Sequence, residues 1–181
     1  RVVGSNNNDN LTASNSGSTF VTQNGNDTLT GGTGADFFNL DTGNTTLVGD
    51  VANGGGGNDT FVIRQSTVSG SVVNLDGGSG SDTLRVIAGA TLDLSNLNAK
   101  NFEKIDLRGD GVSTQASLSK TDILALVDSG SKTLTLRLDS TDSYVIEPES
   151  GINVTQGQSV SFYNGTVVPD NLVAQVNFVY A

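Results

Sequence analysis

The chain of 181 residues contains no cysteine, no histidine, no methionine and no tryptophan, and only two prolines. Without cysteine there is no disulfide framework, so a small secreted domain of this composition needs another source of stability, such as bound metal. Without histidine or cysteine there is no Ser-His-Asp triad, no thiol nucleophile and no HExxH zinc site. A pair of carboxylates is the acid–base chemistry that remains, and we expect the chain not to be an enzyme.

Positive charge is also scarce. Nine Lys and Arg residues stand against 19 Asp and Glu residues, for a net charge of −10, and no Lys or Arg lies between Val2 and Ile63. All acidic residues except three Glu are Asp, whose short side chain tolerates tight turns and reaches a cation held by its own loop. Charge of this sign argues against a nucleic-acid partner. The first residue is Arg1, so we expect a fragment or a processed product.

A repeat of nine residues dominates the first part of the chain. Large apolar residues recur at this spacing between stretches rich in Gly, Asn and Asp: Leu11, Phe20, Leu29, Phe38 and Leu47. This period is too short for a helical repeat and suits a coil of short parallel strands in which each half-turn buries one apolar side chain. An Asp stands two residues before the apolar position at Asp9, Asp27 and Asp36. Carboxylates stacked at a strand spacing of about 4.8 Å repel one another, which favours a bound cation.

Further along the chain the period lengthens to 23 residues. The step relates three glycine pairs (31–32, 54–55, 77–78), three aspartates (Asp36, Asp59, Asp82) and the apolar series Phe38, Phe61, Leu84 and Leu107. A nine-residue half-turn and a fourteen-residue half-turn give this period, so we expect one side of the coil to be five residues longer. Four further aspartates are either ligands or, as we favour, turn caps on that side: Asp41, Asp50, Asp76 and Asp93.

Three segments carry a family resemblance. GGTGADFFN (31–39), GGGGNDTFV (54–62) and GGSGSDTLR (77–85) resemble the nonapeptide GGxGxDxUx of RTX proteins, which binds calcium. The resemblance covers residues 4–85. The segment 101–146 is similar to the module that closes many large RTX adhesins exported by type I secretion.

The fold that this resemblance implies is all-β. We expect a right-handed parallel β-roll or β-helix solenoid over residues 1–99 and a C-terminal β-rich cap over 100–181 that contains one short helix. Ser119 and Asp122 resemble a capping box in front of an apolar run at 123–127, which places the helix there. Alternation of apolar residues predicts strands at 133–138 and 176–180.

The family's calcium chemistry, carried over by position, implies ions that each lie between two neighbouring turns and bind backbone carbonyls and Asp side chains. One site is implied for Gly32, Gly34 and Asp36 with Gly54, Gly56 and Asp59. A second is implied for Gly55, Gly57 and Asp59 with Gly77, Ser79 and Asp82. On the opposite edge a site is implied for Ser5, Asn7 and Asp9 with Thr22, Asn24 and Asp27. About three to four Ca²⁺ ions are expected, since six oxygen ligands suit Ca²⁺ and the usual zinc ligands are absent.

Departures from the pattern limit these sites. Ser18 and Thr45 replace the Asp in two repeats, so sites that depend on them are expected to be weak or empty. Because the period exceeds the family's usual eighteen residues, no ligand is predicted on the opposite edge after Asp27.

The sequence therefore predicts a secreted calcium-binding structural module at the C-terminus of a bacterial RTX adhesin, outside the cell or on its surface, that folds on binding Ca²⁺ after type I export. Its expected partners are calcium, the type I secretion machinery and a cell-surface or host-surface ligand. Residues 174–181 resemble a C-terminal export signal or form a closing edge strand. Alternatives are an S-layer or other self-assembling surface protein, a carrier or secretion domain of an RTX exoenzyme, and a module that binds sugar, ice or a receptor. Thr and Asn keep no single phase, which argues against ice.

Overall fold

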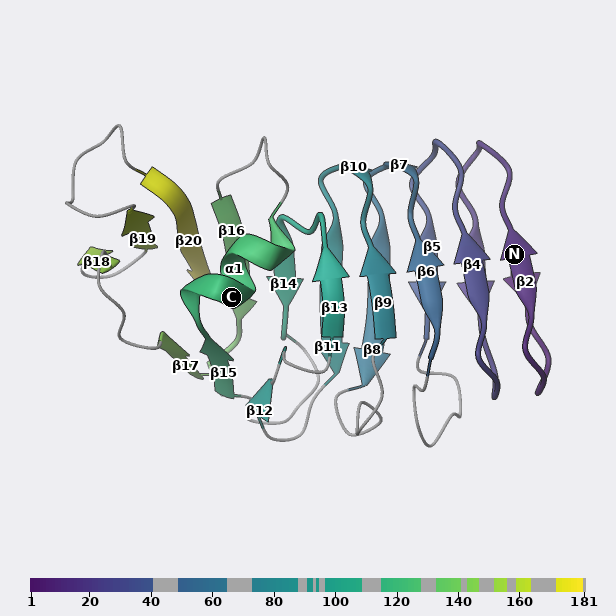
Figure 1. The fold of residues 1–181 in the computed structure, drawn as a ribbon, viewed down its shortest axis with the longest axis horizontal. Coiled ribbons are helices and arrows are strands. Elements are labelled where there is room, and N and C mark those ends of the chain that lie inside the picture. Colours follow the sequence, from purple (N-terminus) through teal and green to yellow (C-terminus); the bar gives the residue numbers. More distant parts are fainter. Residues whose placement is uncertain are drawn as a thin grey trace.

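The computed structural model describes residues 1–40, 49–64, 73–87, 91–92, 94, 97–108, 115–127, 133–140, 143–146, 152–155, 159–163 and 172–180. These residues form an elongated stack of strands, with the first turns at one end and β18 to β20 at the other (Figure 1). No helix among them has the length and apolar character needed to cross a membrane.

Two sheets form the walls of the solenoid, and the chain alternates between them. The first sheet contains, in spatial order, β1 (Val2–Val3), β3 (Thr19–Val21), β5 (Phe37–Asn39), β8 (Thr60–Arg64), β11 (Thr83–Ile87), β14 (Lys104–Asp106), β16 (Thr133–Leu138), β20 (Leu172–Tyr180), β19 (Ser159–Tyr163) and β18 (Ile152–Thr155). The second sheet contains β2 (Asn10–Thr12), β4 (Thr28–Thr30), β6 (Val51–Asn53), β9 (Val73–Asp76) and β13 (Leu97–Lys100). Pairing is parallel except at β18–β19 and β19–β20. The predicted parallel solenoid is confirmed.

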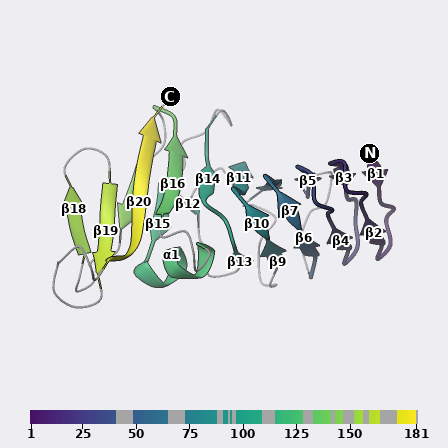
Figure 2. The same cartoon turned by 90° about the horizontal axis from the view of Figure 1, so that it is seen from above.

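Two smaller sheets complete the walls. β7 (Gly56–Gly57) pairs in parallel with β10 (Ser79–Gly80) at one edge of the solenoid. β12 (Thr91–Leu92), β15 (Gln115–Leu118) and β17 (Ser143–Ile146) form a third parallel face. Seen from above, the strands of the facing sheets lie in separate layers along the stack (Figure 2).

Strand register confirms both periods predicted from the sequence. Phe20, Phe38, Phe61 and Leu84 lie opposite one another in the first sheet, and Leu11, Leu29, Ala52 and Leu75 do so in the second. From Phe38 to Ala52 is fourteen residues and from Ala52 to Phe61 is nine, so one side is lengthened as expected. Leu47 falls outside the described residues.

The continuation of the 23-residue step to Leu107 is wrong. Ile105 lies opposite Leu84 instead. The turn that precedes β14 is shorter than its predecessors, so the apolar position arrives two residues earlier.

The core is a column of apolar side chains between the two walls. Phe38 is fully buried and stacks on Phe20 at a centroid distance of 4.6 Å and on Phe61 at 4.3 Å. Phe102 meets Phe61 edge to face at 5.1 Å. Each nine-residue half-turn thus contributes one large side chain, and stacking along the solenoid buries what a single turn leaves exposed.

The predicted short helix is confirmed as α1 (Lys120–Leu126). The Ser119 hydroxyl accepts a hydrogen bond from the Asp122 N–H, and the Asp122 carboxylate accepts one from the Ser119 N–H, which forms a complete capping box. Ile123 and Leu126 are buried, and the helix contacts β13 and β20. The predicted strand at 133–138 is β16, and 176–180 falls within β20. Since β14, β16 and β20 extend the first sheet past residue 99, the division at that residue stays a prediction.

Replacing Phe38 with Ala tests the core column. Removal of a fully buried aromatic ring between two stacked rings is expected to lower the free energy of unfolding by about 3–5 kcal/mol. Urea unfolding in calcium-containing buffer measures the loss. The matched control is Phe37→Ala, because the neighbouring Phe37 side chain points outward and is 39% exposed. Equal losses in the two variants would contradict this account of the core.

Candidate functional site

Acidic side chains form two columns along the edges of the solenoid, at the points where turns enter strands. The first column lies on the edge where the chain passes from the second sheet to the first. Its members each precede a paired residue of the first sheet and are therefore in register: Asp36, Asp59, Asp82 and Glu103. The second column lies on the opposite edge and consists of Asp9, Asp27 and Asp50.

Hydrogen bonds link each member of the first column to the next. The N–H of Asp36 donates to Asp59 Oδ1, the N–H of Asp59 donates to Asp82 Oδ1, and the N–H of Asp82 donates to Glu103 Oε2, each at 2.7 Å. The Ser18 N–H donates to Asp36 Oδ1 in the same way. Each carboxylate therefore fixes the register of the preceding turn through one of its two oxygens.

The second column is built on the same principle. The N–H of Asp9 donates to Asp27 Oδ1 at 2.9 Å, and the N–H of Asp27 donates to Asp50 Oδ1 at 2.8 Å. The sequence analysis predicted no ligand here beyond Asp27. It left Asp50 as a ligand or, by preference, a turn cap, and the structure places Asp50 in line with Asp27.

The second oxygen of most of these carboxylates has no partner. In the described part of the chain, the Oδ2 atoms of Asp27, Asp50, Asp59 and Asp82 are buried and accept no hydrogen bond. All four residues are at most 1% exposed. Leaving a buried acceptor unsatisfied is costly, and a buried unpaired charge costs more. Two such atoms in register on each edge indicate a group that the protein atoms alone do not supply.

The first glycine of each turn lets a carboxylate oxygen and a carbonyl oxygen from the next turn approach each other. A Cβ added to Gly54 would lie 2.2 Å from Asp59 Oδ2 and 2.4 Å from the carbonyl oxygen of Gly77. A Cβ added to Gly31 would lie 2.6 Å from Asp36 Oδ2 and 2.0 Å from the carbonyl oxygen of Gly54. A side chain at either position would therefore collide with both oxygens. The first glycine of each turn thus leaves open a point where a carboxylate and a carbonyl from the next turn converge.

Stacking of the turns brings the remaining predicted carbonyl donors together. The Gly56 N–H donates to the Gly32 carbonyl and the Ser79 N–H donates to the Gly55 carbonyl, both at 2.9 Å. A Cβ on Gly57, where φ is +113°, would lie 2.8 Å from the carbonyl oxygen of Gly34. The predicted glycines therefore lie in adjacent turns, and each carbonyl retains a second lone pair for a ligand.

On the opposite edge the predicted residues also lie in neighbouring turns. Both carboxylate oxygens of Asp9 accept hydrogen bonds from Ser5 in the same turn, the closest from its N–H at 2.6 Å. The Asn24 amide donates to Asn6 of the neighbouring turn at 3.3 Å. The Asn7 N–H donates to the Ser5 hydroxyl, and Thr22 is buried. Asp9 is thus partnered within its turn, unlike Asp27 and Asp50.

Sequence reasoning favoured a turn-cap role for Asp76, and its contacts are of that kind. Its Oδ1 accepts hydrogen bonds from the Gly78 N–H at 3.1 Å and the Asn101 amide at 2.7 Å, and its Oδ2 pairs with Lys100 Nζ at 3.0 Å. Asp41 and Asp93 lie outside the described residues.

No three acidic side chains cluster within reach of one ion in the described ranges. Backbone carbonyls must therefore supply most ligands, as oxygen-rich calcium loops allow.

Burial and mutual repulsion weaken the acidity of the columns. Burial raises the pKa of Asp50 to about 6. The hydrogen bond from the Asp27 N–H lowers this pKa in part, and the negative charge of Asp27 raises it. Burial raises the pKa of Asp82 to about 7. The N–H of Asp59 opposes that rise, the charges of Asp59 and Glu103 add to it, and Lys104 lowers it. These shifts show the cost of ionising the columns without a compensating cation.

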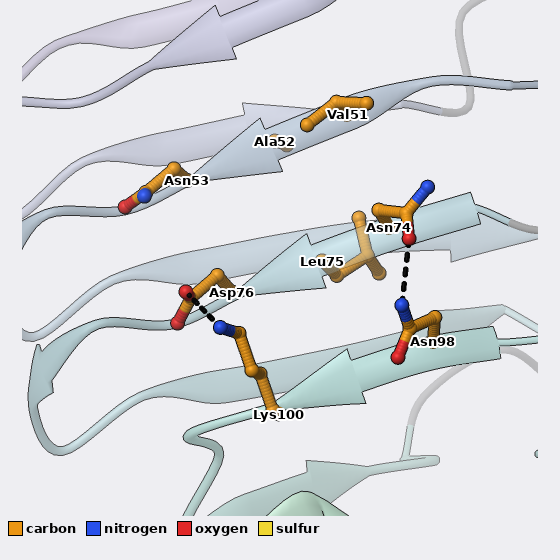
Figure 3. Close-up of a pocket in the computed structure, with 8 residues that line it drawn as sticks. All are labelled: Val51, Ala52, Asn53, Asn74, Leu75, Asp76, Asn98 and Lys100. Carbon is orange, nitrogen blue, oxygen red and sulfur yellow. Dashed lines mark hydrogen bonds and ion pairs between the residues drawn. The ribbon is translucent and has the colours of Figure 1, made fainter.

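A second surface feature lies on the outer face of the second sheet. Parallel register aligns its outward side chains in two rows: Asn10, Thr28, Val51, Asn74, Asn98 and Thr12, Thr30, Asn53, Asp76, Lys100. A hollow of about 330 Å³ lies over β6, β9 and β13, where Asn98 donates to Asn74 at 2.7 Å (Figure 3). The sequence analysis missed these rows, which keep one phase but are interrupted by Val51, Asp76 and Lys100.

Metal-free protein is predicted to lose stability as pH rises. The folded state keeps protons on Asp50 and Asp82 up to pH values of about 6 and about 7, whereas the unfolded chain releases them near 3.8. The folded state thus binds more protons in this window, and the free energy of unfolding falls as pH rises from about 4 to 7. Asp106, whose pKa is lowered beside Arg108, contributes only below this window.

Urea unfolding at a series of pH values in metal-free buffer measures this trend. Calcium binds ionised carboxylates and is expected to abolish or reverse it. Stability that rises steadily with pH in metal-free buffer would contradict the proposed burial of unpaired carboxylates.

A pair of glycine substitutions tests the proposed calcium site beside Asp59. Gly54→Ala places a methyl group at the point where Asp59 Oδ2 and the Gly77 carbonyl converge, so calcium affinity is expected to fall by about tenfold or more. Gly56→Ala is the control, since its Cβ would meet nothing closer than the Ser79 hydroxyl at 3.2 Å. Calcium titration by calorimetry measures both. Equal affinities would place the ion elsewhere.

Comparison with known proteins agrees with this geometry over part of the chain. The model of the RTX calcium-binding nonapeptide repeat (four copies) matches residues 3–38, 12–47 and 49–62, about a third of the sequence. No curated protein and no solved structure matches the chain. Residues 3–47 and 49–62 therefore resemble the RTX calcium-binding nonapeptide repeat.

Proposed function

We propose that this chain is a structural module whose folding depends on calcium. One observation carries the proposal: buried carboxylate oxygens without partners recur at the same place in successive turns. At Asp59, the absence of a side chain on Gly54 lets Oδ2 and the Gly77 carbonyl oxygen approach the same point. Ca²⁺ would supply the positive charge that these turns lack. The matched repeat is a calcium-binding structural repeat rather than a catalytic one.

The proposed ligands on the first edge come from pairs of adjacent turns. Asp36 and Asp59 with the carbonyls of Gly32, Gly34, Gly54 and Gly56 would hold one ion. Asp59 and Asp82 with the carbonyls of Gly55, Gly57, Gly77 and Ser79 would hold the next. On the second edge, Asp27 and Asp50 are the acidic side chains best placed for a ligand, because both keep an unpartnered oxygen.

The energetics favour a switch-like dependence on calcium. A site with a Kd near ~10⁻⁴ M in ~1 mM calcium contributes about 1.4 kcal/mol to the folded state. Three or four such sites contribute about 4–6 kcal/mol, which is comparable to the total stability of a domain, about 5–15 kcal/mol. Without calcium the stacked carboxylates repel, and a Gly-rich chain gains little from its thin core.

This dependence suits a protein exported before it folds. We propose that the module acts outside the cell or on the bacterial surface, after type I export from a calcium-poor cytosol. The similarity of residues 101–146 to the closing module of RTX adhesins supports a place at the C-terminus of such a protein. Calcium and the secretion machinery are its proposed partners, with a cell-surface or host-surface ligand for the parent adhesin.

Circular dichroism with and without calcium tests the proposal. The strand signal is expected to appear in millimolar calcium and to be lost in EGTA, whereas millimolar magnesium should not replace calcium, because Mg²⁺ demands a smaller octahedral site. Asp59→Asn is expected to raise the calcium concentration at half-folding severalfold, since Asp59 belongs to two proposed sites. Asp76→Asn is the control, because Asp76 pairs with Lys100 outside the columns. A strand signal that chelation leaves unchanged would contradict the proposal.

A further inference from the structure

We propose that a calcium site lies one turn beyond the last glycine pair, between the turn at 77–82 and the turn at 101–103. Its carboxylates are those of Asp82 and Glu103, and the carbonyl of Asn101 faces it. The nonapeptide pattern does not encode this site, because the second turn contains no glycine and lies outside the matched repeats. The inference rests on the calcium-binding function proposed above and extends it to residues of a different type.

The geometry at Gly77 continues a series set by the two turns before it. A Cβ added to Gly77 would lie 2.0 Å from the Asn101 carbonyl oxygen and 2.9 Å from Asp82 Oδ2. At Gly54 the same construction meets Gly77 O and Asp59 Oδ2, and at Gly31 it meets Gly54 O and Asp36 Oδ2. Three successive turns thus direct a carboxylate oxygen and the first carbonyl of the following turn at one point.

Asn101 replaces a glycine through its backbone conformation. Its φ of +58° is the one positive value among the described non-glycine residues, and Asn tolerates this region better than most residues. Its side-chain amide donates to Asp76 Oδ1 at 2.7 Å, which anchors the residue. The Gly77 N–H donates to the Lys100 carbonyl at 3.0 Å, so the register of earlier turns is kept up to this position.

Glu103 replaces the aspartate of the earlier turns. The turn between β13 and β14 has three residues (101–103), whereas the turn between β9 and β11 has six (77–82). The backbone of Glu103 therefore does not follow the path of the backbone of Asp82. The extra methylene of Glu103 still brings Oε2 to 2.7 Å from the Asp82 N–H, the same distance as in the two preceding links of the first column. Phe102, between them, is buried and donates its N–H to Leu126 of α1 at 2.8 Å.

An unpartnered buried atom points to a ligand at this place. Asp82 is 0% exposed and its Oδ2 accepts no hydrogen bond. Lys104 is the nearest cation on the adjoining strand, but its ammonium donates to the Ser81 hydroxyl at 2.6 Å and to the Ser81 carbonyl at 3.4 Å. Lys104 therefore offsets part of the negative charge without satisfying Asp82, and it should weaken the site relative to its neighbours.

The test counts calcium ions bound by the full chain, using calorimetric titration and native mass spectrometry. Glu103→Gln keeps an oxygen acceptor for the Asp82 N–H but removes the charge, so it is expected to bind one ion fewer than the unmodified chain. Asp106→Asn removes a charge that pairs with Arg108 rather than with a proposed ligand, and it should leave the count unchanged. Lys104→Gln removes a cation beside Asp82, which belongs to two proposed sites, and should tighten both of them severalfold at an unchanged count.

The outcomes separate this site from the general proposal. If the unmodified chain binds no calcium, the proposed function fails. If it binds calcium and Glu103→Gln has the same count and the same affinities, the terminal site alone is refuted. Should Glu103→Gln not fold, Lys104→Gln decides: two tightened sites support the inference, and one tightened site or none overturns it. A purely structural role for Glu103 predicts that Lys104→Gln tightens only the site shared by Asp59 and Asp82.

Discussion

Parallel register at strand spacing forces the carboxylates of successive turns into contact, and the rest of the structure depends on how this repulsion is relieved. Asp36, Asp59 and Asp82 cannot move apart without unpairing β5, β8 and β11, which hold them in line. Neutralisation by protons is weak near neutral pH, even though burial raises the pKa of Asp82 to about 7. A bound divalent cation removes the repulsion and satisfies the buried oxygens at the same time.

Each buried aspartate combines a structural and a ligand role because a carboxylate has two oxygens. Oδ1 of Asp59 accepts the N–H of Asp36 and sets the register of the turns, while Oδ2 stays without a partner beside Gly54. An amide in the same place could accept the N–H hydrogen bond but would bring no negative charge. The columns thus depend on aspartate for the ion and on hydrogen bonding for the stack, and a substitution can separate the two.

The sequence predicted the architecture wherever one turn resembles the next. Two patterns located Asp27, Asp36, Asp59 and the longer side of the coil. One is an Asp two residues before an apolar residue, and the other is a repeat period of nine or 23 residues. Asp50 escaped because the apolar residue that follows it is the small Ala52, although Asp50 lies 23 residues after Asp27. The sequence analysis did not predict Glu103 as a member of the first column, because its turn is shorter and it is Glu rather than Asp. Both are evident only from register, since pairing in three dimensions tolerates changes of length that a fixed period does not.

The two columns end differently, and this sets where calcium matters most. After Asp50 the aligned position is Val73, a buried apolar residue, so the second edge needs no ion from β9 onward. Most strands of the first sheet are also longer after β5, which has three residues: β8 has five and β20 has nine, although β14 again has three. Longer strands bury more apolar surface and form more backbone hydrogen bonds, so dependence on metal falls toward the C-terminus. We therefore propose that calcium has its largest effect on the folding of the N-terminal turns, which have short strands and acidic residues on both edges.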